Sequence, residues 1–150
     1  MGTTVAELVF ACCRFCPKKQ IIESIITIEK TTNKQKLVES IFDYKSKDGY
    51  NCMIVSFDMM ARYTNETGNL PDSSMPMFNE IESTLFYLIK LADDNKLNMD
   101  KILNWTGDNG RTLFSNAAFY SESLATELLK RNVDVKTVDD LFQTPSFRVS

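Results

Sequence analysis

Hydrophobic residues recur at helical spacing along most of this chain. The pattern predicts helices over residues 4–16, 18–31, 34–44, 77–92, 112–120 and 123–131, with a short helical turn near 100–104. The isoleucines of the second segment leave a strand there as an alternative. Turn-forming residues separate the helical segments, at 45–50, 64–76 and 105–110. Strict alternation of polar and apolar residues is nearly absent, so we expect an all-α fold in which helices pack on helices.

Composition narrows the classes of protein that this chain could be. Its 150 residues suit a single domain, and its 43% hydrophobic and 25% charged content suits a globular protein. The net charge of −3 lacks the basic excess of a nucleic-acid binder. No apolar run reaches transmembrane length and the start does not resemble a secretory signal, so we expect no membrane partner and a cytoplasmic or nuclear location.

The chain contains no histidine, which bears directly on catalysis. Ser-His-Asp and Cys-His nucleophilic sites are excluded, and the commonest metal ligand is missing. Four cysteines are present, Cys12, Cys13, Cys16 and Cys52. The Cys13-x-x-Cys16 spacing would suit zinc, but a second such pair is missing, so free thiols in a reducing compartment are the simpler interpretation. We therefore expect no enzyme activity and no cofactor.

One segment contains a motif with a clear physical function, Gly110-Arg-Thr112-Leu-Phe-Ser-Asn-Ala117-Ala118. The glycine suits a turn with unusual backbone angles, Thr112 can cap the helix that follows, and the small alanines allow neighbouring helices to approach closely. A second helical pattern and then Asn132-Val-Asp134-Val135 come next, where asparagine tolerates the left-handed conformation. Thr144-Pro145 lies 32 residues after Thr112, close to a repeat period of roughly 33.

This segment resembles an ankyrin repeat, most clearly over residues 105–147. Weaker units begin at Asp48-Gly49 and at Met75-Pro76-Met77-Phe78, the second with an outer helix at 85–91 and an exit at 97–100. The resemblance implies short antiparallel helix pairs stacked as a solenoid. We expect a single domain over 1–150, with a helical cap in 1–45 and degenerate repeats in 46–150. The last repeat begins at Thr144-Pro145 and is not completed, so we expect this chain to be the N-terminal part of a longer protein.

The resemblance also implies a function, because ankyrin arrays bind partner proteins through their turns and inner helices. The positions that correspond to family contacts are Asp108, Asn109, Arg111, Phe119, Tyr120, Asp140, Leu141 and Gln143. Phe119 and Tyr120 could equally pack against a neighbouring repeat, and Trp105 suits the core better than a contact surface. The alternative is a compact helical bundle that regulates by holding a helical peptide in a groove. Neither hypothesis names the partner.

Overall fold

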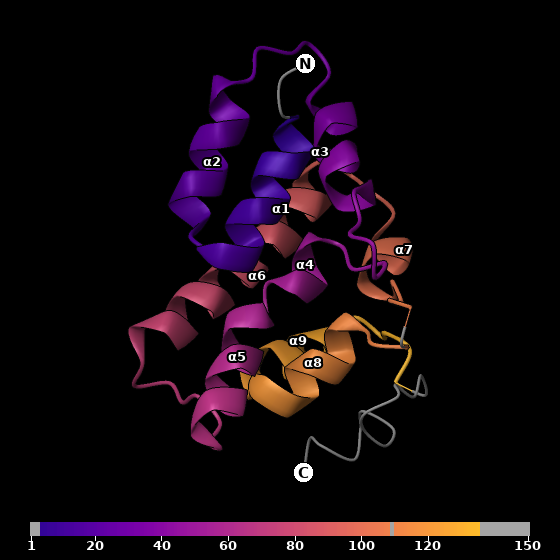
Figure 1. Cartoon of the computed structure of the whole chain (residues 1–150). Coiled ribbons are helices and arrows are strands. Elements are labelled where there is room, and N and C mark those ends of the chain that lie inside the picture. Colours follow the sequence, from indigo (N-terminus) through magenta and orange to yellow (C-terminus); the bar gives the residue numbers. More distant parts are fainter. Residues whose placement is uncertain (1–3, 109, 136–150) are drawn as a thin grey trace.

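Nine α-helices form the part of the chain that the structure, a computed structural model, describes: residues 4–108 and 110–135 (Figure 1). Strand-like pairing in these residues is limited to one antiparallel bridge between Thr106 and Thr112. The predicted all-α fold class is confirmed. The helices are α1 (Val5–Phe15), α2 (Lys19–Ile28), α3 (Lys34–Asp43), α4 (Cys52–Val55), α5 (Asp58–Thr67), α6 (Pro76–Asp94), α7 (Met99–Leu103), α8 (Leu113–Tyr120) and α9 (Glu122–Lys130).

Most helices begin at a polar residue that satisfies the free backbone amides of the first turn. The capping box of α8 is reciprocal: Ser115 N–H donates to the Thr112 hydroxyl at 3.1 Å, and Thr112 N–H donates to the Ser115 hydroxyl at 2.9 Å. The predicted capping role of Thr112 is confirmed. The side chains that accept such bonds are Thr4, Asn33, Asn51, Asn98, Thr112 and Ser121.

The long helix α6 and the last helix α9 end in the same way. Each is followed by a residue in the left-handed region, Lys96 with φ 55° and Asn132 with φ 59°. The next amides, those of Leu97 and Val133, donate to carbonyls five residues earlier at 3.1 and 3.4 Å. This is a Schellman-type ending, in which the apolar residue after the turn is buried against the helix. The left-handed conformation predicted for Asn132 is confirmed.

Six of the described helices lie in two rows of three when the chain is followed from α1 to α9. Helix α1 packs against α2, α3, α4 and α5, and α4 in turn contacts α8. Helix α6 contacts α2 and α3 on one side and α9 on the other, while α8 and α9 pack on each other. In Figure 1, α1–α3 form one end of the described part of the chain, and α5, α8 and α9 lie at the other end. The row α1, α4, α8 and the row α2, α6, α9 share one apolar core.

The segment that begins with α4 is deeply buried. Every residue from 52 to 57 is buried, and the Met53 and Met60 side chains are fully enclosed. Met59, Met75 and Met77 are only partly buried, so the methionines divide between the core and its edge. Apolar residues of both rows and of α3 supply the rest of the core, among them Ile22, Ile41, Phe42, Ile81, Leu88, Phe114, Leu124 and Leu128.

Two predicted boundaries are wrong. The segment from Pro76 to Asp94 is one continuous helix, so it does not divide into an inner helix and an outer helix at 85–91. Pro76 starts this helix, and no strong helix breaker follows it before the end. The predicted loop 64–76 is also too long, because α5 continues to Thr67. Gly68, with φ 75°, ends α5.

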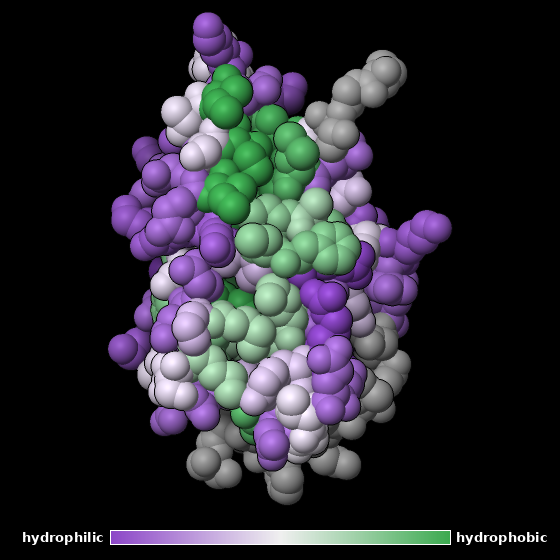
Figure 2. All heavy atoms as spheres, turned by 60° about the vertical axis from the view of Figure 1, so that its left-hand side comes forward, coloured by the Kyte–Doolittle hydropathy of each residue, from purple (hydrophilic) through white to green (hydrophobic). Residues whose placement is uncertain are grey.

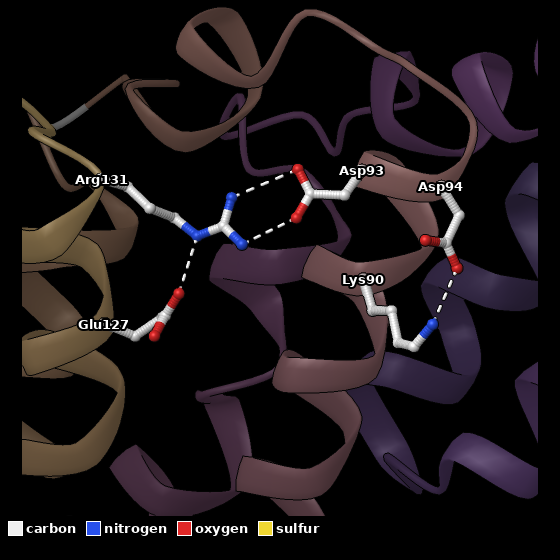
Figure 3. A network of polar contacts seen from close by, with 5 residues as sticks. All are labelled: Lys90, Asp93, Asp94, Glu127 and Arg131. Atoms are coloured by element: carbon white, nitrogen blue, oxygen red, sulfur yellow. Dashed lines mark hydrogen bonds and ion pairs between the residues drawn. The ribbon is translucent and has the colours of Figure 1, made fainter.

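An arginine joins the ends of α6 and α9 (Figure 3). The Arg131 guanidinium makes two bonds to Asp93, at 2.7 and 3.2 Å, and a third to Glu127 at 2.9 Å. The paired geometry and the side chain's 28% exposure make this a stronger link than an ordinary surface ion pair. The neighbouring pair of Lys90 and Asp94, at 3.0 Å, joins exposed side chains within one helix.

Candidate interaction surface

Two turns with the same hydrogen-bond pattern lie side by side, and together they form the centre of the candidate site. In the first turn (residues 46–50) and the second turn (107–111), the N–H of the first residue donates to the carbonyl of the fifth residue, at 3.0 Å and 2.8 Å respectively. The N–H of the fourth residue donates to the carbonyl of the first residue, at 3.0 Å in both turns. That fourth residue is Gly49 or Gly110, with φ 78° and 79°. Each turn leads directly into the residue that caps the next helix, α4 or α8.

Hydrogen bonds lock the two turns together. The Asp108 N–H donates to the Asp48 carbonyl at 2.9 Å, so the tips are joined backbone to backbone. The indole N–H of Trp105 donates to the Gly49 carbonyl at 2.6 Å. Residues far apart in the sequence therefore form one rigid unit.

Close packing of side chains on glycines reinforces this lock. A β-carbon at Gly107 would lie 2.3 Å from Cε1 of Tyr50, and a β-carbon at Gly49 would lie 2.7 Å from Oδ1 of Asp108. Atoms in contact normally stand about 3.5–4.0 Å apart. Each turn therefore has a glycine where the other turn places a side chain.

Trp105 forms one edge of the paired turns. It is partly buried, and the Lys45 ammonium lies 5.9 Å from the centre of its ring, within the range of a cation–π contact. The tips themselves are exposed, at Lys47, Asp48 and Asp108. Trp105 thus supports the turns through its N–H while part of its ring stays at the surface.

The far end of α8 carries an aromatic cluster. Tyr120 stacks on Phe57, with ring centres 5.8 Å apart and planes at 22°. Phe119 meets Tyr120 edge-on, with centres 4.7 Å apart. Tyr120 thus packs on a residue from outside the α8–α9 pair, because Phe57 lies just before α5.

Polar groups surround the Tyr120 phenol. Burial raises its pKa, and the nearby carboxylate of Asp58 acts in the same direction. The Arg111 charge and the Thr64 hydroxyl lower the pKa and partly offset that rise. The second turn and the end of α8 thus meet at Tyr120, because Arg111 belongs to the turn. Asp58 also accepts a bond from the Arg14 guanidinium at 2.9 Å, which extends the polar cluster to α1.

The structure brings part of the predicted contact set together. Asp108 lies at the tip of the second turn, Arg111 lies at its end beside Tyr120, and Phe119 contacts Tyr120. The four remaining predicted positions, Asn109, Asp140, Leu141 and Gln143, lie outside the described residues.

Residues beside the first turn and α5 complete the surface, although the repeat pattern does not point to them. Tyr50 belongs to the first turn, Lys45 lies just before it over the Trp105 ring, and Phe57, just before α5, supports Tyr120. A signal for the first turn was present, because Asp48-Gly49-Tyr50-Asn51 has the same order of a polar residue, glycine and capping residue as 109–112. No sequence signal pairs Phe57 with Tyr120.

The cysteines form no site with the character of a metal centre. A hydrogen bond with Cys13 and then burial raise the pKa of the Cys52 thiol well above its usual value. Burial also raises the pKa of Cys12. A cysteine binds a metal ion as its thiolate, and the environment of Cys52 and Cys12 disfavours that charged form. Within residues 4–108 and 110–135, no group of three potential ligands is placed to hold a metal ion.

None of the helices in the described part of the chain has the length and apolar character needed to cross a bilayer. Comparisons with family models, with curated proteins and with solved structures find no match. The resemblance to ankyrin repeats therefore rests on the amino-acid sequence alone.

Proposed function

We propose that this chain is a protein-interaction module whose helix pairs stack as in an ankyrin array and whose paired turns bind a partner protein. The observation that carries the proposal is the lock between the turns at 46–50 and 107–111. In the ankyrin family, successive turns project side by side from the stack. Here the same turn conformation recurs and the two copies are joined directly.

The packing of the helices supports the stacked arrangement. The pairs would be α1 with α2 and α8 with α9, which pack on each other, and α4–α5 with α6, which are assigned to each other by their position between those two pairs. The first members contact one another in the order α1, α4, α8, and the second members in the order α2, α6, α9. The matching ends of α6 and α9 support α6 as the second helix of its unit. An insertion at α5 and the loop after it would explain why the unit starting at Gly49 is longer than an ordinary repeat.

The chemistry of the surface supports protein binding. Tryptophan, tyrosine and arginine dominate the energetics of protein interfaces, and Trp105, Tyr120 and Arg111 provide one of each. Their supports are fixed before any partner arrives, since Trp105 bonds to Gly49 and Tyr120 stacks on Phe57. Preorganised side chains lose little entropy on binding, which favours affinity.

A charge-reversal comparison tests the proposal. Immobilised wild-type chain and an Arg111→Glu variant would be used to capture partners from a cell extract, followed by quantitative mass spectrometry. Lys130→Glu is the matched control, because it makes the same change of charge at an exposed position on α9. We expect the control to recover the wild-type partners and Arg111→Glu to lose at least one of them about tenfold or more.

A Tyr120→Phe substitution in the same experiment tests a second contact residue without disturbing the packing of its ring. This variant keeps the ring that stacks on Phe57 and removes only the hydroxyl. Circular dichroism would show that each variant keeps its helices. Equal recovery of all partners by wild type, Arg111→Glu and an Arg111→Glu, Tyr120→Phe double variant would contradict the proposed surface.

A further inference from the structure

The first two helices expose an apolar band on the side away from the paired turns. On α1 the exposed side chains are Leu8 (44%) and Phe15 (63%), and on α2 they are Ile21 (42%) and Ile28 (77%). Figure 2 shows this side as a continuous green band with purple atoms on both flanks. Contiguous apolar surface of this kind marks an interaction site in soluble proteins.

The band is hollowed at both ends. A groove of about 720 Å³ lies between α1, α2 and α3, lined by Leu8, Ile28 and Leu37. A smaller hollow of about 260 Å³ lies beside Phe15, where Met59 and Met77 form its walls. A large side chain that projects from one end, such as Phe15, can therefore be received at the other.

The charges beside the band differ between its two ends. Glu29 lines the groove at the Leu8 end, and Glu7 precedes Leu8 in α1. At the Phe15 end, Lys18 and Glu80 line the hollow and the Arg62 guanidinium lies 6.0 Å from the centre of the Phe15 ring. Exposed Lys19 follows at the start of α2. The charged side chain that lines the groove at the Leu8 end is therefore that of Glu29, with exposed Lys30 following it, and the Phe15 end is basic overall.

We propose that a second copy of this chain covers the band, with the two α1 helices antiparallel about a two-fold axis. This arrangement turns Glu29 of each copy toward Lys18 and the basic end of the other, so this charge pair forms twice. It also places Phe15 of each copy over the groove at the partner's Leu8 end. A surface that complements itself under a two-fold rotation is the commonest basis of homodimers.

Sedimentation equilibrium of the full chain tests the homodimer. We expect the wild type to have twice the 17.1 kDa mass of one chain and to dissociate on dilution. Phe15→Asp should raise the dimer Kd by about 100-fold or more, because the substitution enters the interface twice. Leu129→Asp is the matched control, since Leu129 is an exposed leucine of α9 outside the band. It should leave the Kd unchanged.

Charge exchange tests the orientation of the two copies. Lys18→Glu and Glu29→Lys should each weaken the dimer, and the double variant should recover affinity because the exchanged charges again face each other. Leu8→Asp provides a second apolar variant, with circular dichroism as the check on folding. A wild type that stays monomeric up to millimolar concentration overturns the proposal. So does a dimer that Phe15→Asp leaves intact or that Leu129→Asp disrupts equally.

Discussion

Replacing Gly107 by alanine should destabilise the protein through a clash with Tyr50. The new β-carbon would lie 2.3 Å from Cε1 and 2.5 Å from Cδ1 of the tyrosine ring. Two non-bonded carbon atoms in contact normally lie about 3.5 Å or more apart, so the tyrosine ring or the turn must move by about 1 Å. Inserting a methyl group into a packed site of this kind costs about 1–3 kcal/mol.

A double-mutant cycle isolates that clash from other effects. In a Tyr50→Ala background the Asp48 carbonyl oxygen remains 3.5 Å from the β-carbon at position 107, an ordinary contact distance, so the cost of Gly107→Ala should fall to within about 0.5 kcal/mol of zero. The coupling energy between the two sites should therefore be about 1–3 kcal/mol. Gly68→Ala is the control. Gly68 has φ 75° and no neighbouring atom within 4 Å, so its cost of about 1 kcal/mol comes from the backbone and should not depend on Tyr50.

Urea unfolding measures these free energies. Trp105 is the one tryptophan of the chain and is bonded within the paired turns, so its fluorescence reports on this region, while far-UV circular dichroism reports on the helices. Coincident transitions would justify a two-state analysis. An equal cost of Gly107→Ala in both backgrounds would refute the proposed lock between the turns.

Three further predictions concern the capping, the ion pairs and the pH dependence of stability. Thr112→Ala should lower the free energy of unfolding by about 1 kcal/mol in urea, because the first turn of α8 loses its cap. Arg131→Ala should cost about 1–2 kcal/mol through its two bonds to one carboxylate, whereas Lys90→Ala should change stability by less than about 0.5 kcal/mol in the same assay. Because folding raises the pKa of the Tyr120 phenol, the unfolded state loses the phenol proton at a lower pH than the folded state does, at about pH 10. Wild type should therefore lose more stability than Tyr120→Phe as pH rises above that value, measured by urea unfolding at a series of pH values, and equal losses would contradict the assignment.

Local chemistry explains why the helix starts and turns were predictable. Thr112 and Asn132 act within a few residues of their own position, so sequence alone indicates a cap at the first and a left-handed ending at the second. Gly110 marks its turn for the same reason. The all-α class follows from periodicity, which a single sequence displays directly.

The boundaries failed where local signals conflicted with the surrounding fold. Met75-Pro76 resembles the start of a short inner helix, but the apolar pattern continues to Asp94, and α2, α3 and α9 pack against α6, which favours one long helix. The residues 64–67 have loop-like composition, yet they extend α5 until Gly68 ends it. Low helix propensity at a helix end is easily offset by packing elsewhere in the helix.

About half of the candidate surface could be predicted. Arg111 and Tyr120 were found because the repeat pattern points to them. The contribution of Tyr50 and Phe57 depends on which segments meet in space, and single-sequence patterns hold no information on contacts between residues so far apart. The apolar band of α1 and α2 was missed for a related reason: an exposed isoleucine and a buried one have the same helical spacing.

Hydrogen–deuterium exchange on the captured complex would locate the bound partner on the chain. We expect a bound partner to slow exchange in both turns, 46–50 and 107–111, and at the end of α8, relative to the free chain. We expect no added protection in α9 around the control residue Lys130. Protection that leaves both turns unchanged while the partner is bound would contradict the proposal that this chain binds through its paired turns.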